Sequence, residues 1–146
     1  MQTTTDQLTT TTTINAPIDR VWKAVTTPAL IKQWFFGVDT TSDWAVGSLL
    51  VHTGEYQGKP YVDKGEILRI QPPRLLEHSH WSEVSGKADR PDQYQVVTWV
   101  LSEHGDGTEL TVSERNLPSK EASETSEGAW KMALGKLKEL LEQTDR

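Results

Sequence analysis

The residue pattern in the first third of the chain predicts one strand followed by two short helices. Residues 8–14 are mostly Thr, which is β-branched, and the run closes in Ile14, so we predict a strand there. Asn15, a residue of the N-cap type, opens a segment with apolar residues at helical spacing: Ile18, Val21, Trp22 and Val25. Pro28 ends this helix and begins a second one, which Gly37 stops. The apolar stripe of the second helix consists of Leu30, Ile31, Trp34 and Phe35.

From residue 44 to residue 115, segments of strand composition alternate with turn residues. Strands are predicted at residues 46–56, 61–70, 75–81, 94–102 and 108–115. The breaks between them contain Gly, Pro and Asp, and their short length predicts an antiparallel meander. Gly54 and Gly65 lie inside two of the strands, where a lone glycine indicates a bulge or a sharp bend. We therefore expect a curved sheet.

After Pro118 the helical spacing returns and continues almost to the end of the chain. Ser123 is the expected N-cap, and the helix is expected to fray near Gln143. Its apolar positions recur at intervals of three and four residues: Ala129, Trp130, Ala133, Leu134, Leu137, Leu140 and Leu141. Such an amphipathic helix has to cover one face of the curved sheet, which makes an α+β fold.

The length and composition fit one domain with a modest core. A chain of 146 residues is one domain's worth, and no repeat or long linker divides it. Hydrophobic residues make up 35% of the chain. We treat residues 1–146 as a single domain with an ordered core at about 8–143.

Charge and residue inventory exclude several classes of function. Fifteen Lys and Arg against 21 Asp and Glu give a net charge of −6, which disfavours nucleic acid and anionic membrane surfaces as partners. The absence of Cys excludes disulfides, thiolate metal sites and cysteine nucleophiles. The Thr-rich start has neither the basic residues nor the apolar stretch of a secretory signal, and no run is long enough to span a bilayer. We predict a cytoplasmic protein without a cofactor.

Six Trp residues are the compositional oddity of this chain. Trp34, Trp81, Trp99 and Trp130 fall on separate predicted elements, an arrangement that suits the wall of a shared cavity. The alternative is plain core packing, which is what large aromatic side chains usually do. Trp22 is interpreted as a core residue.

The histidines offer candidate polar chemistry. His78 and His80 are two residues apart in a predicted strand, so both imidazoles share one face about 7 Å apart. Facing inward, they would be polar anchors for a ligand or, with His52, a three-His metal site. Facing outward, they would leave Glu77 and Trp81 on the inner face.

Other catalytic signatures are absent from the sequence. There is no Gly-rich phosphate loop and no Gly-x-Ser-x-Gly elbow. The acidic residues of the predicted strands do not form a recognisable pair, and we interpret them as solvated: Glu55, Asp63, Glu66 and Glu77.

Several segments resemble the family of activators of the heat-shock-protein-90 ATPase (homologue type). They are INAPIDRVWKAVTTPALIKQWFFG, WAVGSLL, GEILRIQPPRLLEHSHW, VTWVLSEHGDGTELTVSE and EGAWKMALGKLKELLE. Ala16-Pro17 with Val21 and Trp22 is similar to the family's entry to its first helix. Ser48 and Leu49 depart from the Gly and aromatic residue usual in its strand. This family belongs to the START-like (SRPBCC, polyketide-cyclase-like) superfamily, which includes the birch-pollen-allergen fold.

The resemblance implies a helix-grip fold, in which a seven-stranded antiparallel sheet wraps the C-terminal helix and the two short helices close one end of an elongated pocket. We therefore interpret the protein, a monomer or homodimer, as a non-enzymatic and stress-related binder of a hydrophobic or amphipathic small molecule. The candidate ligand-binding residues are Trp34, Phe35, His52, His78, His80, Trp81, Trp99, Trp130 and Leu134.

The sequence leaves two alternatives open. The family resemblance implies regulation of a chaperone ATPase by protein contact. The pocket histidines suggest a cyclase, hydrolase or metal-assisted lyase.

Overall fold

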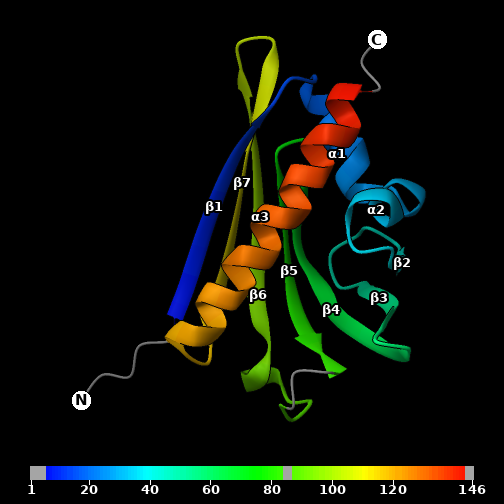
Figure 1. The fold of residues 1–146 in the computed structure, drawn as a ribbon, viewed down its shortest axis with the longest axis vertical. Helices are drawn as coiled ribbons and strands as arrows, with labels where there is room; N and C mark the ends of the chain where they lie inside the picture. Colours follow the sequence, from blue (N-terminus) through cyan, green and yellow to red (C-terminus); the bar gives the residue numbers. More distant parts are fainter. Residues whose placement is uncertain (1–5, 84–86, 144–146) are drawn as a thin grey trace.

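One curved antiparallel sheet carries the architecture, with a long helix lying across its concave face (Figure 1). The computed structural model describes residues 6–83 and 87–143. Within them, seven strands lie in the order β1-β7-β6-β5-β4-β3-β2. The strands are β1 (Asp6–Ile14), β2 (Asp39–Ser42), β3 (Leu49–Tyr56), β4 (Lys59–Gln71), β5 (Leu75–Ser82), β6 (Gln95–His104) and β7 (Gly107–Leu117). The helices are α1 (Ile18–Thr26), α2 (Pro28–Trp34) and α3 (Lys120–Gln143), with a 3-10 turn, η2, at Pro91–Gln93. The expected α+β helix-grip fold and the meander are confirmed.

The two short helices lie where the sequence predicts them, but the N-cap of α1 is Pro17 rather than Asn15. The carbonyl of Pro17, not a group of Asn15, accepts the first α1 amides, from Arg20 and Val21. Pro28 begins α2, as its fixed φ and missing N–H favour. The Trp34 indole donates to the carbonyl of Ala24 at 3.0 Å, which ties α2 to α1.

Strand β2 was not predicted, and β3 begins three residues later than expected. β2 has only four residues, too few for a periodic pattern to stand out from a loop. Residues 45–48 form a turn in which Gly47 has a φ of +89° and the Ser48 amide donates to the carbonyl of Ala45. The Val46 to Ser48 segment is therefore a corner that leads into β3, not its first residues.

The N-cap of the C-terminal helix is Ser119 rather than Ser123, and α3 begins at Lys120. The Ser119 hydroxyl accepts the amide of Ala122, which is the N-cap geometry. Ser123 lies inside α3, is buried, and donates to the carbonyl of Gln7 in β1.

Two further α3 side chains reach the other end of β1. Lys138 Nζ donates to the carbonyl of Thr13 at 2.6 Å, and Glu142 accepts the amide of Asn15 at 2.8 Å. Lys138 also pairs with Glu142 at 2.8 Å. The helix is therefore fastened along the outer strand of the sheet.

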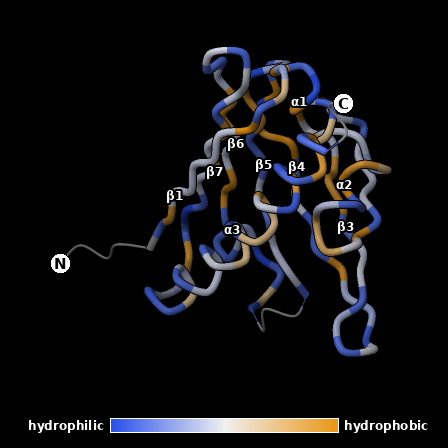
Figure 2. The backbone as a smooth tube through the Cα atoms, turned by 45° about the horizontal axis from the view of Figure 1, so that its top comes forward, coloured by the Kyte–Doolittle hydropathy of each residue, from blue (hydrophilic) through white to orange (hydrophobic). Residues whose placement is uncertain are grey.

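The core fills the space between the sheet, α1, α2 and α3. Its fully buried members include Ile14, Val21, Ile67, Leu110 and Leu137. Figure 2 shows hydrophobic stretches alternating with polar ones along the strands. Because α3 packs closest to β1, its other side faces the middle strands across a gap that side chains have to fill.

Gly65 lies where β4 and β5 approach each other closely. A Cβ at Gly65 would overlap the carbonyl oxygen of Ser79 in β5. The register pairs Lys64 with Trp81 and Ile67 with His78, and between them the Glu66 amide donates to the Ser79 hydroxyl. The register shift between β4 and β5 lies just beyond, between Ile67 and Arg69.

Candidate functional site

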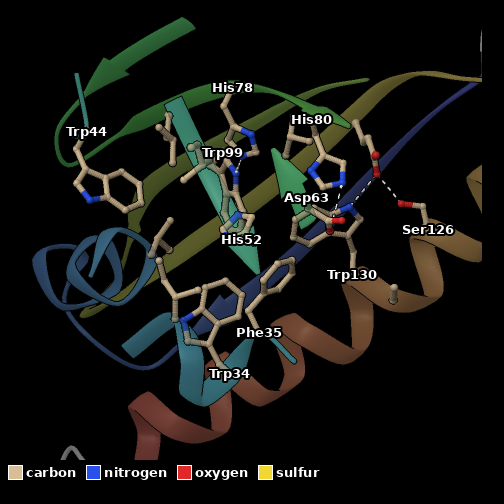
Figure 3. A pocket seen from close by; sticks show the side chains of 17 residues that line it. Trp34, Phe35, Trp44, His52, Asp63, His78, His80, Trp99, Ser126 and Trp130 are labelled. Carbon is tan, nitrogen blue, oxygen red and sulfur yellow. Dashed lines mark hydrogen bonds and ion pairs between the residues drawn. The ribbon is translucent and has the colours of Figure 1, made fainter. Parts of the chain in front are cut away.

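A cavity of about 160 Å³ lies between α3, α2 and the concave face of the sheet (Figure 3). Side chains from every strand except the outer pair β1 and β2 reach it. Its walls consist of Val25, Ile31, Trp34, Phe35, Trp44, Leu50, His52, Asp63, Leu76, His78, His80, Val97, Trp99, Glu114, Ser126, Ala129 and Trp130.

The structure brings most of the predicted site residues together in this wall. They are Trp34, Phe35, His52, His78, His80, Trp99 and Trp130. His78 and His80 share the inner face of β5, as the alternation predicts, which decides between the inward and outward arrangements.

Trp81 and Leu134 lie elsewhere. Trp81 follows His80 directly, so the alternation turns it to the outer face of the sheet, where it stacks on Tyr94 with ring centroids 6.3 Å apart. Leu134 is 1% exposed and belongs to the core, one turn of α3 beyond Trp130.

Aromatic rings form one end of the cavity. The Trp99 ring meets Trp34 and Trp130 edge-on, with centroids 6.0 and 5.2 Å away. Phe35 stacks on Trp130 at 5.8 Å and contacts His52 at 5.5 Å. Each of these rings therefore packs against at least one other ring in an edge-on or stacked geometry, which aromatic pairs favour.

His78 is a structural member of the wall. Its Nδ1–H donates to the carbonyl of Ser79 at 3.0 Å, so Nε2 is unprotonated and accepts the Trp99 indole N–H at 3.0 Å. Burial lowers the pKa of His78 from 6.5 to about 4. Since both ring nitrogens are engaged, His78 has no lone pair left for a metal or a ligand.

His52 is neutral as well. Its Nδ1 lies 2.8 Å from the Thr40 hydroxyl in β2. Burial, followed by the proximity of His78 and His80, lowers the pKa of His52 from 6.5 to about 3. Across the described residues no group of three His, Cys, Asp or Glu side chains is placed to hold a metal ion, so the three-His metal hypothesis is wrong for this arrangement.

Acidic and hydroxyl groups form the other end of the cavity, on the right of Figure 3. Glu114, 5% exposed, accepts the Ser126 hydroxyl at 2.5 Å and the Trp130 indole N–H at 3.0 Å. Asp63 Oδ2 lies 3.9 Å from His80 Nε2. Burial is the main cause of a raised pKa of Asp63, which His80 and the Ser82 hydroxyl partly oppose.

The acidic end of the cavity was not predicted from the sequence. Asp63 was interpreted as solvated, yet its side chain is 16% exposed and lines the cavity. Glu114 follows Leu110 and Val112 at intervals of two, so the alternation of β7 was the signal that places it inward. Glu77 is also buried, but on the outer face, where Arg69 holds it through two hydrogen bonds and lowers its pKa.

The family comparison covers nearly the whole chain. A family model described as Activator of Hsp90 ATPase homolog 1-like protein matches residues 15–142. No curated protein matches the sequence.

Solved structures share the fold over similar lengths. ChR145 from Cytophaga hutchinsonii is 38% identical with a TM-score of 0.84, and the alignment covers 98% of each chain. CalU16 from Micromonospora echinospora is 32% identical with a TM-score of 0.70, over 91% of this chain and 74% of that one. MLL2253 from Mesorhizobium loti has a TM-score of 0.79 at 23% identity, over 97% of this chain and 100% of that one, which shows the fold alone. No helix in the described part of the chain is long and apolar enough to cross a membrane.

Proposed function

This chain belongs to the family of Activator of Hsp90 ATPase homolog 1-like proteins, and its helix-grip fold has a cavity beneath α3. We propose that it binds a small hydrophobic or amphipathic molecule in this cavity. The observation that carries the proposal is the cavity of about 160 Å³ with its aromatic wall.

The cavity of about 160 Å³ has room for roughly one ring. An apolar cavity of about 150 Å³ accommodates benzene. Burying about 150–250 Å² of apolar surface supplies roughly 4–6 kcal/mol before the costs of association. Because the costs of association reduce this figure, a simple aromatic probe is expected to bind with a dissociation constant of about 0.1 mM or weaker.

Titration with toluene tests the proposal. NMR signals of the Trp99 and Trp130 indole N–H groups should shift with saturation, because both rings line the cavity. The signal of Trp22, which packs against the core away from the cavity wall, serves as the internal reference.

A matched pair of α3 variants locates the binding site. Ala129 lines the cavity and is exposed, so Ala129→Trp should block it and weaken toluene binding at least tenfold. Met132 is 59% exposed and lies outside the wall, so Met132→Trp should bind as the wild type does. Equal binding by both variants, or no saturable shift in the wild type, would contradict the proposal.

Mass spectrometry of the natively purified protein addresses the ligand's identity. A single-ring compound that co-purifies with the wild type and is lost from Ala129→Trp is the expected result.

The family description supports a second candidate, regulation of the Hsp90 chaperone ATPase by protein contact. Purified protein would then be retained by immobilised Hsp90 and would change its ATP turnover. Absence of retention at micromolar concentration would contradict this candidate and leave the cavity proposal intact.

A further inference from the structure

Among the described residues of the cavity wall, one fully buried side-chain oxygen has no hydrogen-bond donor, and it belongs to Asp63. Glu114 Oε1 already receives two donors, from Ser126 and Trp130, and both ring nitrogens of His78 are engaged. Among the described side chains, Asp63 Oδ1 is a buried polar atom without a hydrogen-bond partner. The other such atom, Thr10 Oγ1, does not line the cavity.

A buried carboxyl oxygen without a donor is costly, because desolvation is not compensated. The protein groups around Asp63 do not remove this cost. His80 stands 3.9 Å from Oδ2, beyond hydrogen-bond distance, and the Ser82 hydroxyl is the hydrogen-bond donor to the carboxylate. Neither supplies a partner for Oδ1.

We propose that the molecule bound in this cavity carries one hydrogen-bond-donating group, a hydroxyl or an amine, on a small apolar ring, and that Asp63 Oδ1 accepts a hydrogen bond from it. This inference rests on the proposed function and specifies its ligand class. The ring packs against Phe35, Trp99 and Trp130, while the donor lies at the acidic end.

The same arrangement selects against ligands with a carboxylate. Asp63 and Glu114 both line the acidic end, so a carboxylate ligand meets like charge there. An amine would add charge complementarity, because a cation beside Asp63 favours its ionised form and lies near aromatic faces. Amines and alcohols are therefore expected to bind more tightly than carboxylates built on the same ring.

Calorimetric titration with toluene, benzyl alcohol, benzylamine and benzoate tests the inference. The measured quantity is the ratio of the toluene to the benzyl alcohol dissociation constant, which removes effects on the ring itself. This ratio should fall about tenfold in Asp63→Leu, which has no acceptor, and stay unchanged in Asp106→Leu, which alters an exposed turn. Benzoate should bind the wild type more weakly than benzyl alcohol does.

Asp63→Asn provides a second variant that keeps an acceptor oxygen. Its alcohol ratio should remain near the wild-type value, whereas benzylamine should lose at least fivefold in affinity because the charge is gone. This variant decides the matter even where Asp63→Leu does not fold.

The outcomes separate this inference from the proposed function. Toluene binding with an alcohol ratio that is the same in wild type and Asp63→Leu, or benzylamine binding unaffected by Asp63→Asn, would overturn the donor assignment and leave the cavity as a binding site. Failure of all four probes, toluene included, would overturn the proposed function and this inference with it.

Discussion

Glu114 connects the sheet to α3 at the level of single atoms. Its carboxylate is buried and receives two donors from the helix, Ser126 and Trp130. Removing an acceptor strands buried donors, and this costs more than the hydrogen bonds contribute net.

Glu114→Ala is expected to lower the free energy of unfolding by about 2 kcal/mol or more, because both donors lose their partner. Glu114→Gln keeps an acceptor oxygen and should cost less than about 1 kcal/mol. Urea unfolding of both variants measures the difference, and equal losses would show that the charge, not the acceptor, matters.

The two buried histidines make stability depend on pH. Their folded pKa values of about 3 for His52 and about 4 for His78 lie below the ordinary 6.5, so the unfolded chain binds more protons between these limits. Their stabilising contribution is complete above pH 6.5 and is lost as the pH falls toward 4 and then 3. The raised pKa of Asp63 opposes this loss near its own range, and the lowered pKa of Glu77 adds to it below pH 4.5.

Urea unfolding between pH 7 and pH 4.5 should therefore show stability falling by up to about 1.4 kcal/mol per pH unit for each of these histidines. His78→Gln should reduce the slope by about half, whatever its effect on the stability at pH 7. His104→Gln, at an exposed position, is the control and should leave the slope unchanged. A slope that survives His78→Gln would contradict the assignment.

At the residue scale, alternation along strands carried most of the predictive information. The alternation placed His78 and His80 on one face of β5. The same rule excludes Trp81 from the cavity wall and places Glu114 in it. The hydrogen bond from Trp99 to His78 was beyond it, since that contact depends on the register of two strands.

Among the elements, β4 and β5 approach each other so closely at Gly65 that a side chain does not fit there. A Cβ at Gly65 would meet the carbonyl of Ser79, which is backbone and cannot move alone. A Cβ at Gly54 would lie 2.7 Å from the terminal ring atoms of Tyr61, which are the end of a side chain. Both glycines are in strands, so the intrinsic effect of Ala is similar for the two.

Gly65→Ala is expected to destabilise the protein by about 3 kcal/mol or more, because the two strands have to separate. Gly54→Ala should change stability by less than about 1 kcal/mol, because a partly exposed Tyr ring can turn away. Thermal unfolding of the pair measures both. Similar losses at the two sites would refute the close-approach explanation.

The elements themselves were largely predictable. The positions of proline and glycine predicted the helix pair and the meander, because proline fixes the local backbone and glycine permits the turns. β2 and the cap at Ser119 were missed, since a four-residue edge strand depends on its neighbour and several Ser residues compete as caps. The path of the sheet around α3 came from the family resemblance rather than from periodicity.

For the whole molecule, the cavity couples ligand binding to stability, because its wall is assembled from distant parts of the chain and exists only in the folded state. A ligand that binds the folded state alone stabilises it according to its concentration. Toluene at ten times its dissociation constant should raise the free energy of unfolding by about 1.4 kcal/mol. Ala129→Trp should show no such increase, and an equal increase in that variant would place toluene elsewhere.

The fastening of α3 to β1 bears on how copies of this protein meet. An outer strand with free backbone groups can template pairing with a second chain. Here side chains of Ser123, Lys138 and Glu142 hold backbone groups at or next to both ends of β1. At the opposite edge of the sheet, β2 has only four residues that could pair with another strand. Edge-to-edge joining of sheets is the usual route from an open β structure to aggregates. Here the β1 edge is obstructed by α3, and the β2 edge is too short to pair over more than a few residues.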